Sequence, residues 1–360
     1  MKILILANFD VGLYQFRREL IAELLKNNQV FISLPYGKLV DKLVEMGCEF
    51  IDTPLDRRGI NPLKDFKLIR SYYSIINDIE PDLVITYTIK PNIYGGFVCK
   101  IKKVPYAINI TGLGTAFERD VILRKMVTMM YKVSLKKAKI VFFENSENQG
   151  IFIDEKIVTQ NQTCLLNGAG VNLDYYTYSE YPHNDKVHFL FVGRVMKEKG
   201  IDELLDAMQS LIKEGKNCCL DVVGPCEDDY EDILKEHEQE GWLKYFGYQD
   251  DVRSFVQSCD CFVLPSYHEG MANTNLESAA MGRPVITSNI PGCREAVIDG
   301  ITGLLCESKN VSSLYVALTR IIELDSAERK KMGVAGRKHM CKVFDKNKVV
   351  KITIANMLGE

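Results

Sequence analysis

Short apolar runs alternate with longer amphipathic segments along the chain. Apolar runs of this length, bounded by segments of helical period, are typical of buried strands linked by helices, the βαβ arrangement of a parallel sheet. We therefore predict one doubly wound α/β domain over about the first 165 residues. Its predicted strands are 3–7, 30–34, 48–51, 83–86, 106–110 and 140–143, and its predicted helices are 16–26, 39–46, 68–79, a segment from 93, and 121–137.

The same alternation resumes after residue 186 and predicts a second doubly wound, Rossmann-like domain. The preceding segment, 172–185, is rich in Tyr, Asn, Asp and Pro and lacks apolar periodicity, so we place a hinge there. Two domains also suit a chain of 360 residues. The second set of predicted strands is 187–192, 219–223, 261–264 and 284–287, with helices at 202–214, 230–239 and 276–281. The predicted organisation is an N-terminal domain at 1–170, a linker at 171–186, a second domain at 187–345, and a C-terminal helix at 346–360 that packs back towards the N-terminal domain.

Composition narrows the class of protein. With 46% hydrophobic and 26% charged residues the chain is an ordinary globular protein, and a net charge of −3 gives no reason to expect nucleic acid as a partner. The eleven cysteines are scattered and form no CxxC pair, which favours a reduced cytosol over a disulfide framework or a zinc site. The first apolar run is too short for a signal peptide, and no run approaches the roughly 18–20 residues of a membrane span.

A basic loop follows the strand predicted at 187–192. Gly193 and Gly200 let the backbone approach an anion, and the following helix N-terminus offers unpaired N–H groups. Arg194 can grip phosphate oxygens as a fork, and Lys199 can act as a point charge. The loop predicts a diphosphate site, with a solvated basic turn as the alternative.

Two carboxylates, Glu269 and Glu277, stand eight residues apart after the strand predicted at 261–264. Gly270 and the polar run 273–275 indicate that a loop precedes the helix, so both acids can face one pocket. Carboxylates accept hydrogen bonds from vicinal hydroxyls, so one can hold a transferred sugar and the other a ribose. The alternatives are a surface loop acid at Glu269 and a helix acid at Glu277 that the macrodipole stabilises.

These motifs resemble the retaining glycosyltransferases of family four, a GT-B group with two Rossmann-like domains. The resemblance covers almost the whole chain. It implies a metal-independent enzyme that takes a sugar from a nucleotide-diphosphate donor, with no cofactor. Further residues that carry it are Val223-Gly224-Pro225, Phe246-Gly247 with Asp251-Val252, Pro265-Ser266, Gly282-Arg283-Pro284-Val285, Pro291-Gly292 with Glu295, and Asp299-Gly300 with Thr302-Gly303.

The resemblance also assigns roles to residues. Arg194 and Lys199 would bind the donor diphosphate, Glu269 the transferred hexose, and Glu277 the ribose. Gly12, in a loop after the first strand, would face the same phosphates. The catalytic set is thus Arg194, Lys199 and Glu269, and the donor-binding set is Gly12, Gly193, Gly224, Tyr248, Gly270, Met271, Ala272, Asn273, Thr274 and Glu277.

The N-terminal half departs from many relatives in one respect. No histidine precedes His183, and the segment 109–115 contains Thr-Gly-Leu-Gly instead. This version is similar to the branch that builds bacterial capsule, O-antigen and glycoprotein glycans on undecaprenyl diphosphate, including N-acetylgalactosaminyltransferases. It implies a UDP-sugar donor, best GalNAc, a polyprenyl-diphosphate-linked glycan acceptor that Thr111 and Gly112 approach, and a cytoplasmic protein held peripherally at the inner face of the plasma membrane.

A basic amphipathic segment at 118–139 predicts contact with an anionic membrane. It carries a surplus of five positive charges, with apolar residues between them. Such a helix can lie on an anionic leaflet, but a crossover helix with a solvated basic face is an equal alternative. The basic residues that we assign to the acceptor and membrane side are Arg119, Arg124, Lys125, Lys136 and Lys137, with Lys100, Lys102 and Lys103 nearby.

Other motifs carry less weight. The acidic run 227–232 opens a helix, where acids are favoured electrostatically, so we expect no metal site. His268 adjoins Glu269 and either contacts the donor or makes a local hydrogen bond. Two rival functions remain: a sugar-nucleotide epimerase or hydrolase of the same fold, and a catalytically silent sugar-nucleotide-binding protein.

Overall fold

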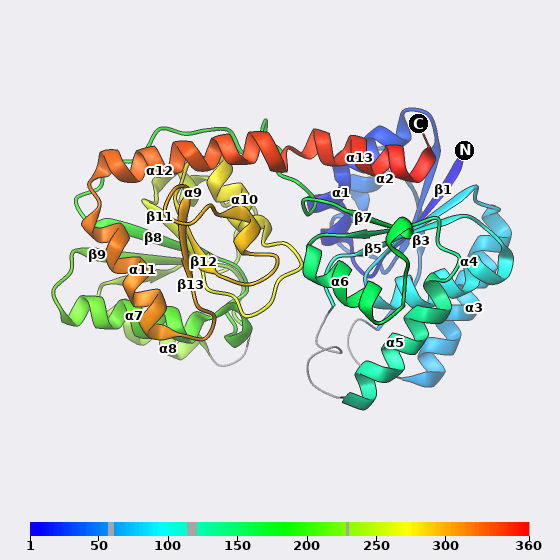
Figure 1. Ribbon diagram of the computed structural model, residues 1–360, viewed down its shortest axis with the longest axis horizontal. Helices are drawn as coiled ribbons and strands as arrows, with labels where there is room; N and C mark the ends of the chain where they lie inside the picture. Colours follow the sequence, from blue (N-terminus) through cyan, green and yellow to red (C-terminus); the bar gives the residue numbers. More distant parts are fainter. Residues whose placement is uncertain (57–60, 114–120, 228–229, 360) are drawn as a thin grey trace. The chain divides into compact units, whose positions relative to one another are not determined.

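The computed structural model describes residues 1–56, 61–113, 121–227 and 230–359 (Figure 1). Contacts within the chain divide it into two compact units. The first unit is Met1–Ala169 with Asn347–Glu360, and the second is Gly170–Lys346. Each unit is described below by itself.

The first unit is built on a seven-stranded parallel sheet with the order β3-β2-β1-β4-β5-β6-β7. Because β1 has β2 on one side and β4 on the other, the sheet winds outwards in both directions from its first strand. The strands are β1 (Lys2–Leu6), β2 (Gln29–Leu34), β3 (Glu49–Asp52), β4 (Leu83–Tyr87), β5 (Tyr106–Ile110), β6 (Ile140–Phe143) and β7 (Thr163–Leu165).

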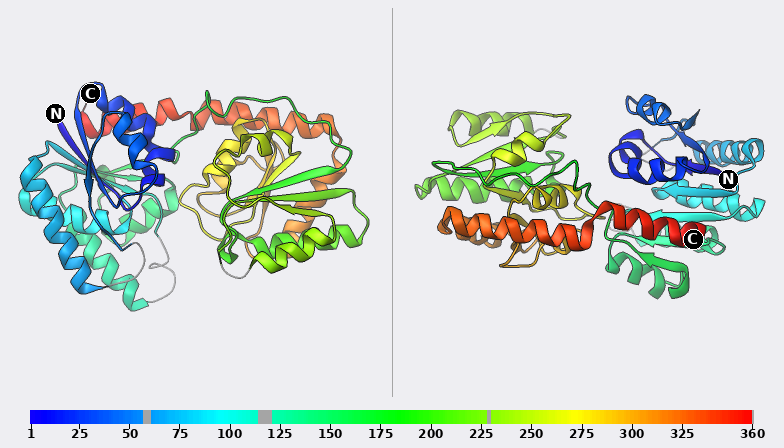
Figure 2. Two further views of the ribbon diagram at one scale, coloured as in Figure 1. Left: turned by 180° about the vertical axis from the view of Figure 1, so that it is seen from behind. Right: turned by 90° about the horizontal axis from the view of Figure 1, so that it is seen from above.

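Helices cover both faces of this sheet (Figures 1 and 2). Successive side chains of a strand point to opposite faces, and β1 shows it: Ile3 and Ile5 join the core under α1, α2 and α13, while Leu4 and Leu6 join the core under α3 to α6. Each face of the sheet therefore has its own hydrophobic core, which the helices on that face cover. The helices are α1 (Asp10–Leu25), α2 (Val40–Glu45), α3 (Pro62–Ile79), a π-helical turn (Pro91–Gly95) that continues into α4 (Gly96–Lys102), α5 (Val121–Leu135), α6 (Ser146–Asp154) and α13 (Lys346–Leu358).

The second unit repeats this architecture with a six-stranded parallel sheet of order β10-β9-β8-β11-β12-β13. Its strands are β8 (Val187–Val192), β9 (Cys218–Val223), β10 (Leu243–Tyr245), β11 (Cys261–Leu264), β12 (Val285–Ser288) and β13 (Gly303–Cys306). Its helices are α7 (Ile201–Lys213), α8 (Tyr230–Gln239), α9 (Arg253–Ser258), α10 (Asn273–Ala280), α11 (Val311–Glu323) and α12 (Ser326–His339), followed by a π-helical turn (Met340–Phe344).

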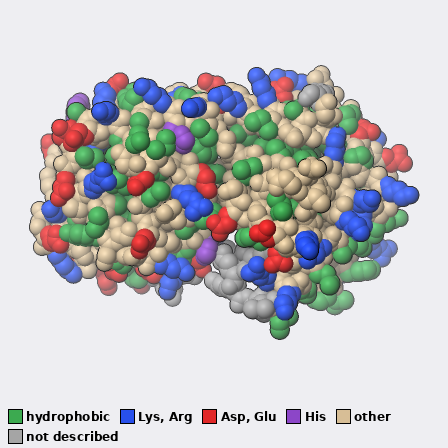
Figure 3. Space-filling view, viewed as in Figure 1, with side chains coloured by type: hydrophobic (Ala, Val, Ile, Leu, Met, Phe, Trp, Pro, Cys, Tyr) green, Lys and Arg blue, Asp and Glu red, His purple; other side chains and the backbone are tan. Residues whose placement is uncertain are grey.

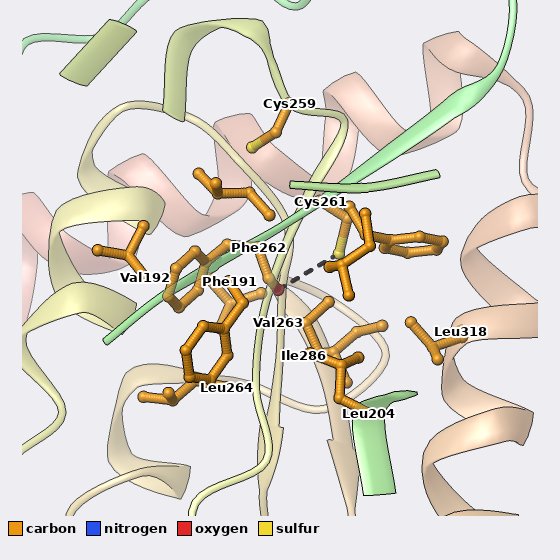
Figure 4. Close-up of a cluster of buried hydrophobic side chains, with 14 of the residues drawn as sticks. Phe191, Val192, Leu204, Cys259, Cys261, Phe262, Val263, Leu264, Ile286 and Leu318 are labelled. Atoms are coloured by element: carbon orange, nitrogen blue, oxygen red, sulfur yellow. Dashed lines mark hydrogen bonds between the residues drawn. The ribbon is translucent and has the colours of Figure 1, made fainter. Parts of the chain in front are cut away.

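The central strands of the second unit form its core. Phe191 on β8, Val263 on β11 and Ile286 on β12 are fully buried and pack with Leu204 and Leu318 from α7 and α11 (Figure 4). Continuous apolar strands are expected where helices cover both faces of a parallel sheet. The prediction of two doubly wound α/β sheets is confirmed.

Several element boundaries differ from the predictions. Helix α1 begins at Asp10, directly after the extended residue Phe9, so Gly12 lies inside the helix and not in a loop. Helix α10 begins at Asn273, so the polar run 273–275 is its first turn. The first turn of a helix has N–H groups without partners inside the helix and often contains polar residues. Because such a turn lacks apolar periodicity, the hydrophobic pattern does not show where the helix begins. The predictions omitted β7, β10, β13, α6, α9, α11 and α12.

The segment 171–186, predicted as a linker, is fixed to the second unit. The buried guanidinium of Arg283 donates to the carbonyl oxygens of Ser179 and Glu180 at 3.1 and 2.9 Å. Tyr181 donates to the carbonyl oxygen of Asp260 at 2.8 Å. The first and last residues of the second unit lie close together, because the N–H of Val171 donates to the carbonyl oxygen of Phe344 at 2.7 Å. At Gly170, where φ is +70°, a Cβ would lie 2.7 Å from the backbone of Lys346, so this close approach requires glycine.

Candidate functional site

The predicted phosphate and sugar residues meet at the carboxyl edge of the second sheet. Strand β8 pairs with β9 on one side and with β11 on the other, so β8 and β11 flank the point where the strand order reverses. Ligands of open α/β sheets bind outside the carboxyl ends at such a point. The loop 193–200 follows β8 and the loop 265–272 follows β11, so both motifs lie at this switch point.

An ion pair joins the two loops. Lys199 Nζ lies 2.5 Å from Glu269 Oε1, and the side chains are only 19% and 13% exposed. Ser266 Oγ donates to the same carboxylate oxygen at 2.8 Å. Within the described part of the chain Glu269 Oε2 makes no hydrogen bond, so it is the oxygen that can accept a ligand hydroxyl. Sequence reasoning missed Ser266 as a partner, although its place three residues before Glu269 was visible.

Backbone contacts hold the two loops against each other. The N–H of Tyr267 donates to the carbonyl oxygen of Glu198 at 2.9 Å. Gly200 has φ of +72°, and a Cβ there would lie 2.1 Å from the carbonyl oxygen of Pro265. A Cβ on Gly224, at φ of +139°, would lie 1.9 Å from the carbonyl oxygen of Gly193. Glycine at Gly200 and Gly224 is therefore required for loop packing.

Arg194 stands apart from the Lys199 and Glu269 pair. Its NH1 atom lies 3.1 and 3.2 Å from the two carboxylate oxygens of Glu227, and its side chain is 45% exposed. The guanidinium keeps other N–H groups that can grip a phosphate. The exposed position suits a charge that meets an incoming anion.

Two helix N-termini point their N–H groups at the same edge. The residues that precede α7 and α10 are Gly200 and Ala272, and neither caps its helix with a side chain. Uncapped N–H groups and the helix dipole favour a negative charge or an acceptor oxygen. The Oδ1 atom of Asn273, in the first turn of α10, is buried and has no hydrogen-bond partner among the described residues. The N–H of Ala272 already donates to the carbonyl oxygen of Gly292 at 2.7 Å, so the first turn of α10, with Asn273, is the part of this loop that offers a polar group to a ligand.

Glu277 lies one turn further along α10 and is half-buried. Burial raises the pKa of this carboxyl to about 7, and a hydrogen bond from Tyr176 and the charge of Lys346 oppose the rise. The group therefore changes between acid and carboxylate near neutral pH. A ligand hydroxyl that donates to Glu277 stabilises the carboxylate.

The remaining predicted residues are more scattered. Tyr248 is 61% exposed in the loop after β10. Thr111 and Gly112 follow β5 in the first unit and are half-exposed. Gly12 lies in α1, with a Phe9 ring carbon 3.1 Å from where its Cβ would be. Arg119 lies outside the described residues.

The metal-ligating types of side chain and the histidine near this edge were the other candidates in the sequence. Among the described residues, His, Cys, Asp and Glu side chains form no group of three that could hold a metal ion. The described part of the acidic run includes Glu227, which pairs with Arg194. His268 is exposed beside Glu269. No disulfide joins any of the cysteines in the described part of the chain.

Two families match the chain. Residues 2–145 match the family described as glycosyl transferase 4-like, and residues 179–339 match glycosyl transferases group 1. The second match contains the whole β8 and β11 switch point. The solved structure of Anabaena Alr3699/HepE in complex with UDP is 17% identical, with a TM-score of 0.79 and coverage of 100% of both chains.

Two related enzymes match most of the chain. The N,N'-diacetylbacillosaminyl-diphospho-undecaprenol alpha-1,3-N-acetylgalactosaminyltransferase of Campylobacter jejuni is 26% identical over 343 residues, 90% of each chain. The UDP-Gal:alpha-D-GlcNAc-diphosphoundecaprenol alpha-1,3-galactosyltransferase of Escherichia coli is 28% identical over 325 residues, 84% of this chain and 82% of the relative. Because the two family models together match residues 2–145 and 179–339 and the fold is that of a solved glycosyltransferase, the chain belongs to the glycosyltransferases and has the two-domain GT-B fold.

Proposed function

We propose that this glycosyltransferase moves a hexose or N-acetylhexosamine, best GalNAc, from a UDP-sugar to a saccharide on undecaprenyl diphosphate, with retention and without a metal. The observation that carries the proposal is the Lys199 and Glu269 pair at the β8 and β11 switch point, with uncapped helix N-termini beside it. The second unit is the donor-binding domain, and the first unit is the acceptor domain. The Campylobacter and Escherichia relatives, named for transfer to diphosphoundecaprenol-linked sugars, support the acceptor class.

The donor is held by charges and hydroxyl acceptors. Arg194 and Lys199 bind the diphosphate and stabilise the negative charge that develops as it leaves. Glu269, fixed by Lys199 and Ser266, orients the hexose through Oε2, and Glu277 accepts from the ribose hydroxyls. The assigned cations and helix termini supply the electrostatic stabilisation, so turnover should not need a divalent ion.

The proposed step is front-face transfer. A bond forms between the acceptor hydroxyl oxygen and the anomeric carbon as the bond from that carbon to the UDP oxygen breaks. The acceptor proton passes to the leaving β-phosphate. No protein nucleophile is invoked, and the configuration at the anomeric carbon is retained.

A basic and apolar surface on α5 supports a peripheral membrane location at the inner face. Ile122 and Met129 are 79% and 70% exposed, and Met126 and Val133 are 44% and 40% exposed. Val127 and Tyr131, on the other side of the helix, are buried in the core. Figure 3 has the same view as Figure 1, and at its lower right, where α5 lies, hydrophobic and basic side chains lie next to each other. No helix in the described part of the chain is long and apolar enough to cross a bilayer.

The α5 surface can be tested by vesicle co-sedimentation. Arg124, Lys125, Lys136 and Lys137 are exposed, and each basic residue near an anionic leaflet contributes ~1 kcal/mol of binding. Replacing all four by Gln should release the protein from vesicles that contain anionic lipid. A matched variant that replaces the exposed residues Lys213, Lys235, Lys331 and Lys338 of the second unit should still sediment. Equal sedimentation of both variants contradicts the proposed surface.

The catalytic proposal is tested by donor turnover with and without acceptor. UDP-sugars are screened first by thermal shift, and those that bind are incubated with a short polyprenyl-diphosphate-linked N-acetylglucosamine, with and without EDTA. The proposal predicts UDP release that depends on the acceptor and is unchanged by EDTA. An isomerised or free sugar in the absence of acceptor identifies an epimerase or hydrolase instead. Donor binding without turnover identifies a silent binding protein.

A further inference from the structure

The first sheet has a switch point of its own, between β1 and β4. Asn8 stands just beyond β1, Thr88 directly follows β4, and Thr111 directly follows the neighbouring strand β5. Parallel strands bring these three polar side chains to one edge of the sheet. A ligand of the first unit is therefore expected at this edge.

A cavity of about 260 Å³ lies there, lined by residues of the first unit alone. Asn8, Thr88 and Thr111 supply its amide and hydroxyl groups, and Leu55 and Ile89 supply half-buried apolar walls. Pockets for drug-sized ligands measure ~300–1,000 Å³. The cavity is slightly smaller, and it has room for one sugar residue.

The Asn8 amide lacks a partner in this cavity. Its Oδ1 atom is buried without a hydrogen bond, and no other hydrogen bond of its side chain joins it to the described residues. Most buried polar atoms in proteins are paired, so this oxygen requires a donor from a ligand or water. The N–H of an acetamido group or a sugar hydroxyl supplies one.

The Thr88 backbone is strained at the cavity wall. Its φ is +73°, an unusual value for a β-branched residue. Buried Asn92 fixes this loop: its N–H donates to the carbonyl oxygen of Thr88 at 2.9 Å, and its amide group bonds to Thr86 and to the carbonyl oxygen of Asn109. Strain that the surroundings enforce is characteristic of functional sites.

The charge at the cavity favours a neutral ligand. Lys90 also lines it, but Lys90 Nζ lies 2.9 Å from Asp65 Oδ1, with both side chains largely buried. The lining residues thus present one cation whose charge is already balanced. A phosphate would have to break this pair, whereas a neutral sugar would not.

From this geometry we infer that the cavity binds the acetamido sugar at the reacting end of the acceptor, with Asn8 accepting from its N–H and Leu55 and Ile89 contacting its acetyl methyl. The inference rests on the proposed function, whose acceptor it specifies. Both related enzymes are named for acceptors that begin with an acetamido sugar. The cavity assigns that recognition to particular residues of this chain.

The test compares acceptors that differ only in the acetamido group. Wild type, Asn8→Ala and the exposed control Asn27→Ala are assayed with short polyprenyl diphosphates that carry N-acetylglucosamine or glucose. We expect Asn8→Ala to raise KM for the acetamido acceptor about tenfold, equivalent to ~1.4 kcal/mol. KM for the glucose acceptor should rise by a smaller factor, and the thermal shift with UDP should not change. An acetamido preference that survives Asn8→Ala overturns the inference.

A binding measurement separates this inference from the proposed function. Saturation-transfer difference NMR with methyl N-acetyl-α-glucosaminide should show transfer to the acetyl methyl in wild type and Asn27→Ala. It should be lost in Asn8→Ala and in Leu55→Trp, which fills the cavity. The absence of this signal in wild type, or its survival in both variants, overturns the inference. If wild type shows the signal but transfers no sugar, the proposed function fails and the sugar site stands.

Discussion

The Lys199 and Glu269 ion pair contributes to both stability and turnover, and a set of substitutions separates the two contributions. The atoms lie 2.5 Å apart, and Ser266 Oγ supports the same carboxylate oxygen. Lys199→Met leaves Glu269 largely buried with one neutral donor. Glu269→Gln keeps an oxygen that Ser266 and Lys199 can still reach. The double variant removes both charges.

The magnitude lies between two limits. Exposed ion pairs contribute ~0.2–1 kcal/mol, whereas removing one partner of a buried pair costs ~3–5 kcal/mol. With exposures of 19% and 13%, this pair is closer to the buried limit. We expect Lys199→Met to lose about 2 kcal/mol of unfolding free energy, and Glu269→Gln about 1 kcal/mol. The double variant should lose at least 1 kcal/mol less than the sum, because no buried charge is left unpaired.

Urea unfolding of the two single variants and the double variant measures this coupling, and turnover is measured on the same samples. Lys197→Met is the matched control, since Lys197 is exposed in the same helical turn. Turnover should fall ~10²–10³-fold in Lys199→Met and stay low in the double variant, because a lost transition-state cation is not restored by removing its partner. Additive stability losses would show that Lys199 and Glu269 are not coupled, and turnover that recovers with stability would exclude Lys199 as a transition-state cation.

Three further outcomes follow from the second unit. Arg283→Met should lose ~3–5 kcal/mol of unfolding free energy by urea titration, because the buried carbonyl oxygens of Ser179, Glu180 and Val256 lose their donor. The exposed control Arg70→Met should lose under ~0.5 kcal/mol, and similar losses in the two variants would contradict the role of Arg283. Gly200→Ala should lower both stability and turnover, because its Cβ would lie 2.1 Å from the carbonyl oxygen of Pro265. In the control Gly215→Ala, φ is +74° and nothing lies near the new Cβ, so only the cost of a left-handed backbone, ~1–2 kcal/mol of unfolding free energy, is expected. Equal effects of the two variants would contradict the loop packing. Burial holds the pKa of Glu277 at about 7, above the 4.5 of an ordinary Glu, so the native state binds this proton more tightly and the contribution of Glu277 to stability falls as pH rises from about 4.5 to 7. UDP affinity should rise between pH 6 and 8 as Glu277 becomes a carboxylate. Glu277→Gln should remove both pH dependences, and unchanged pH dependences would count against the assignment.

The sequence predicted those features that depend on local pattern. Apolar runs located β5, β6, β8 and β11 to the residue, because strands buried on both faces are continuous in apolar character. The three-residue strands β7 and β10, which read Thr-Cys-Leu and Leu-Lys-Tyr, lack that signal. Neighbouring strands complete them in the fold, and the chain alone does not show which neighbours they have.

The sequence named candidate site residues but could not show the contacts between them. The motifs named Lys199 and Glu269, but their ion pair depends on β8 and β11 being neighbours, which is a property of sheet order. Arg283 belongs to a family motif, yet in the structure it binds backbone carbonyls and is fully buried. Asn8 and Thr88 carried no motif, since their significance comes from a shared cavity.

Transfer of a sugar to a lipid-diphosphate acceptor with retention is tested most directly by NMR and mass spectrometry of the lipid product. A UDP-sugar with an α anomeric bond, beginning with UDP-GalNAc, is incubated with the short polyprenyl-diphosphate-linked N-acetylglucosamine. We expect an acceptor heavier by one sugar, one UDP released per product, and a small anomeric coupling that identifies an α linkage. A β-linked product would contradict retention, and consumption of the donor without a heavier acceptor would contradict transfer.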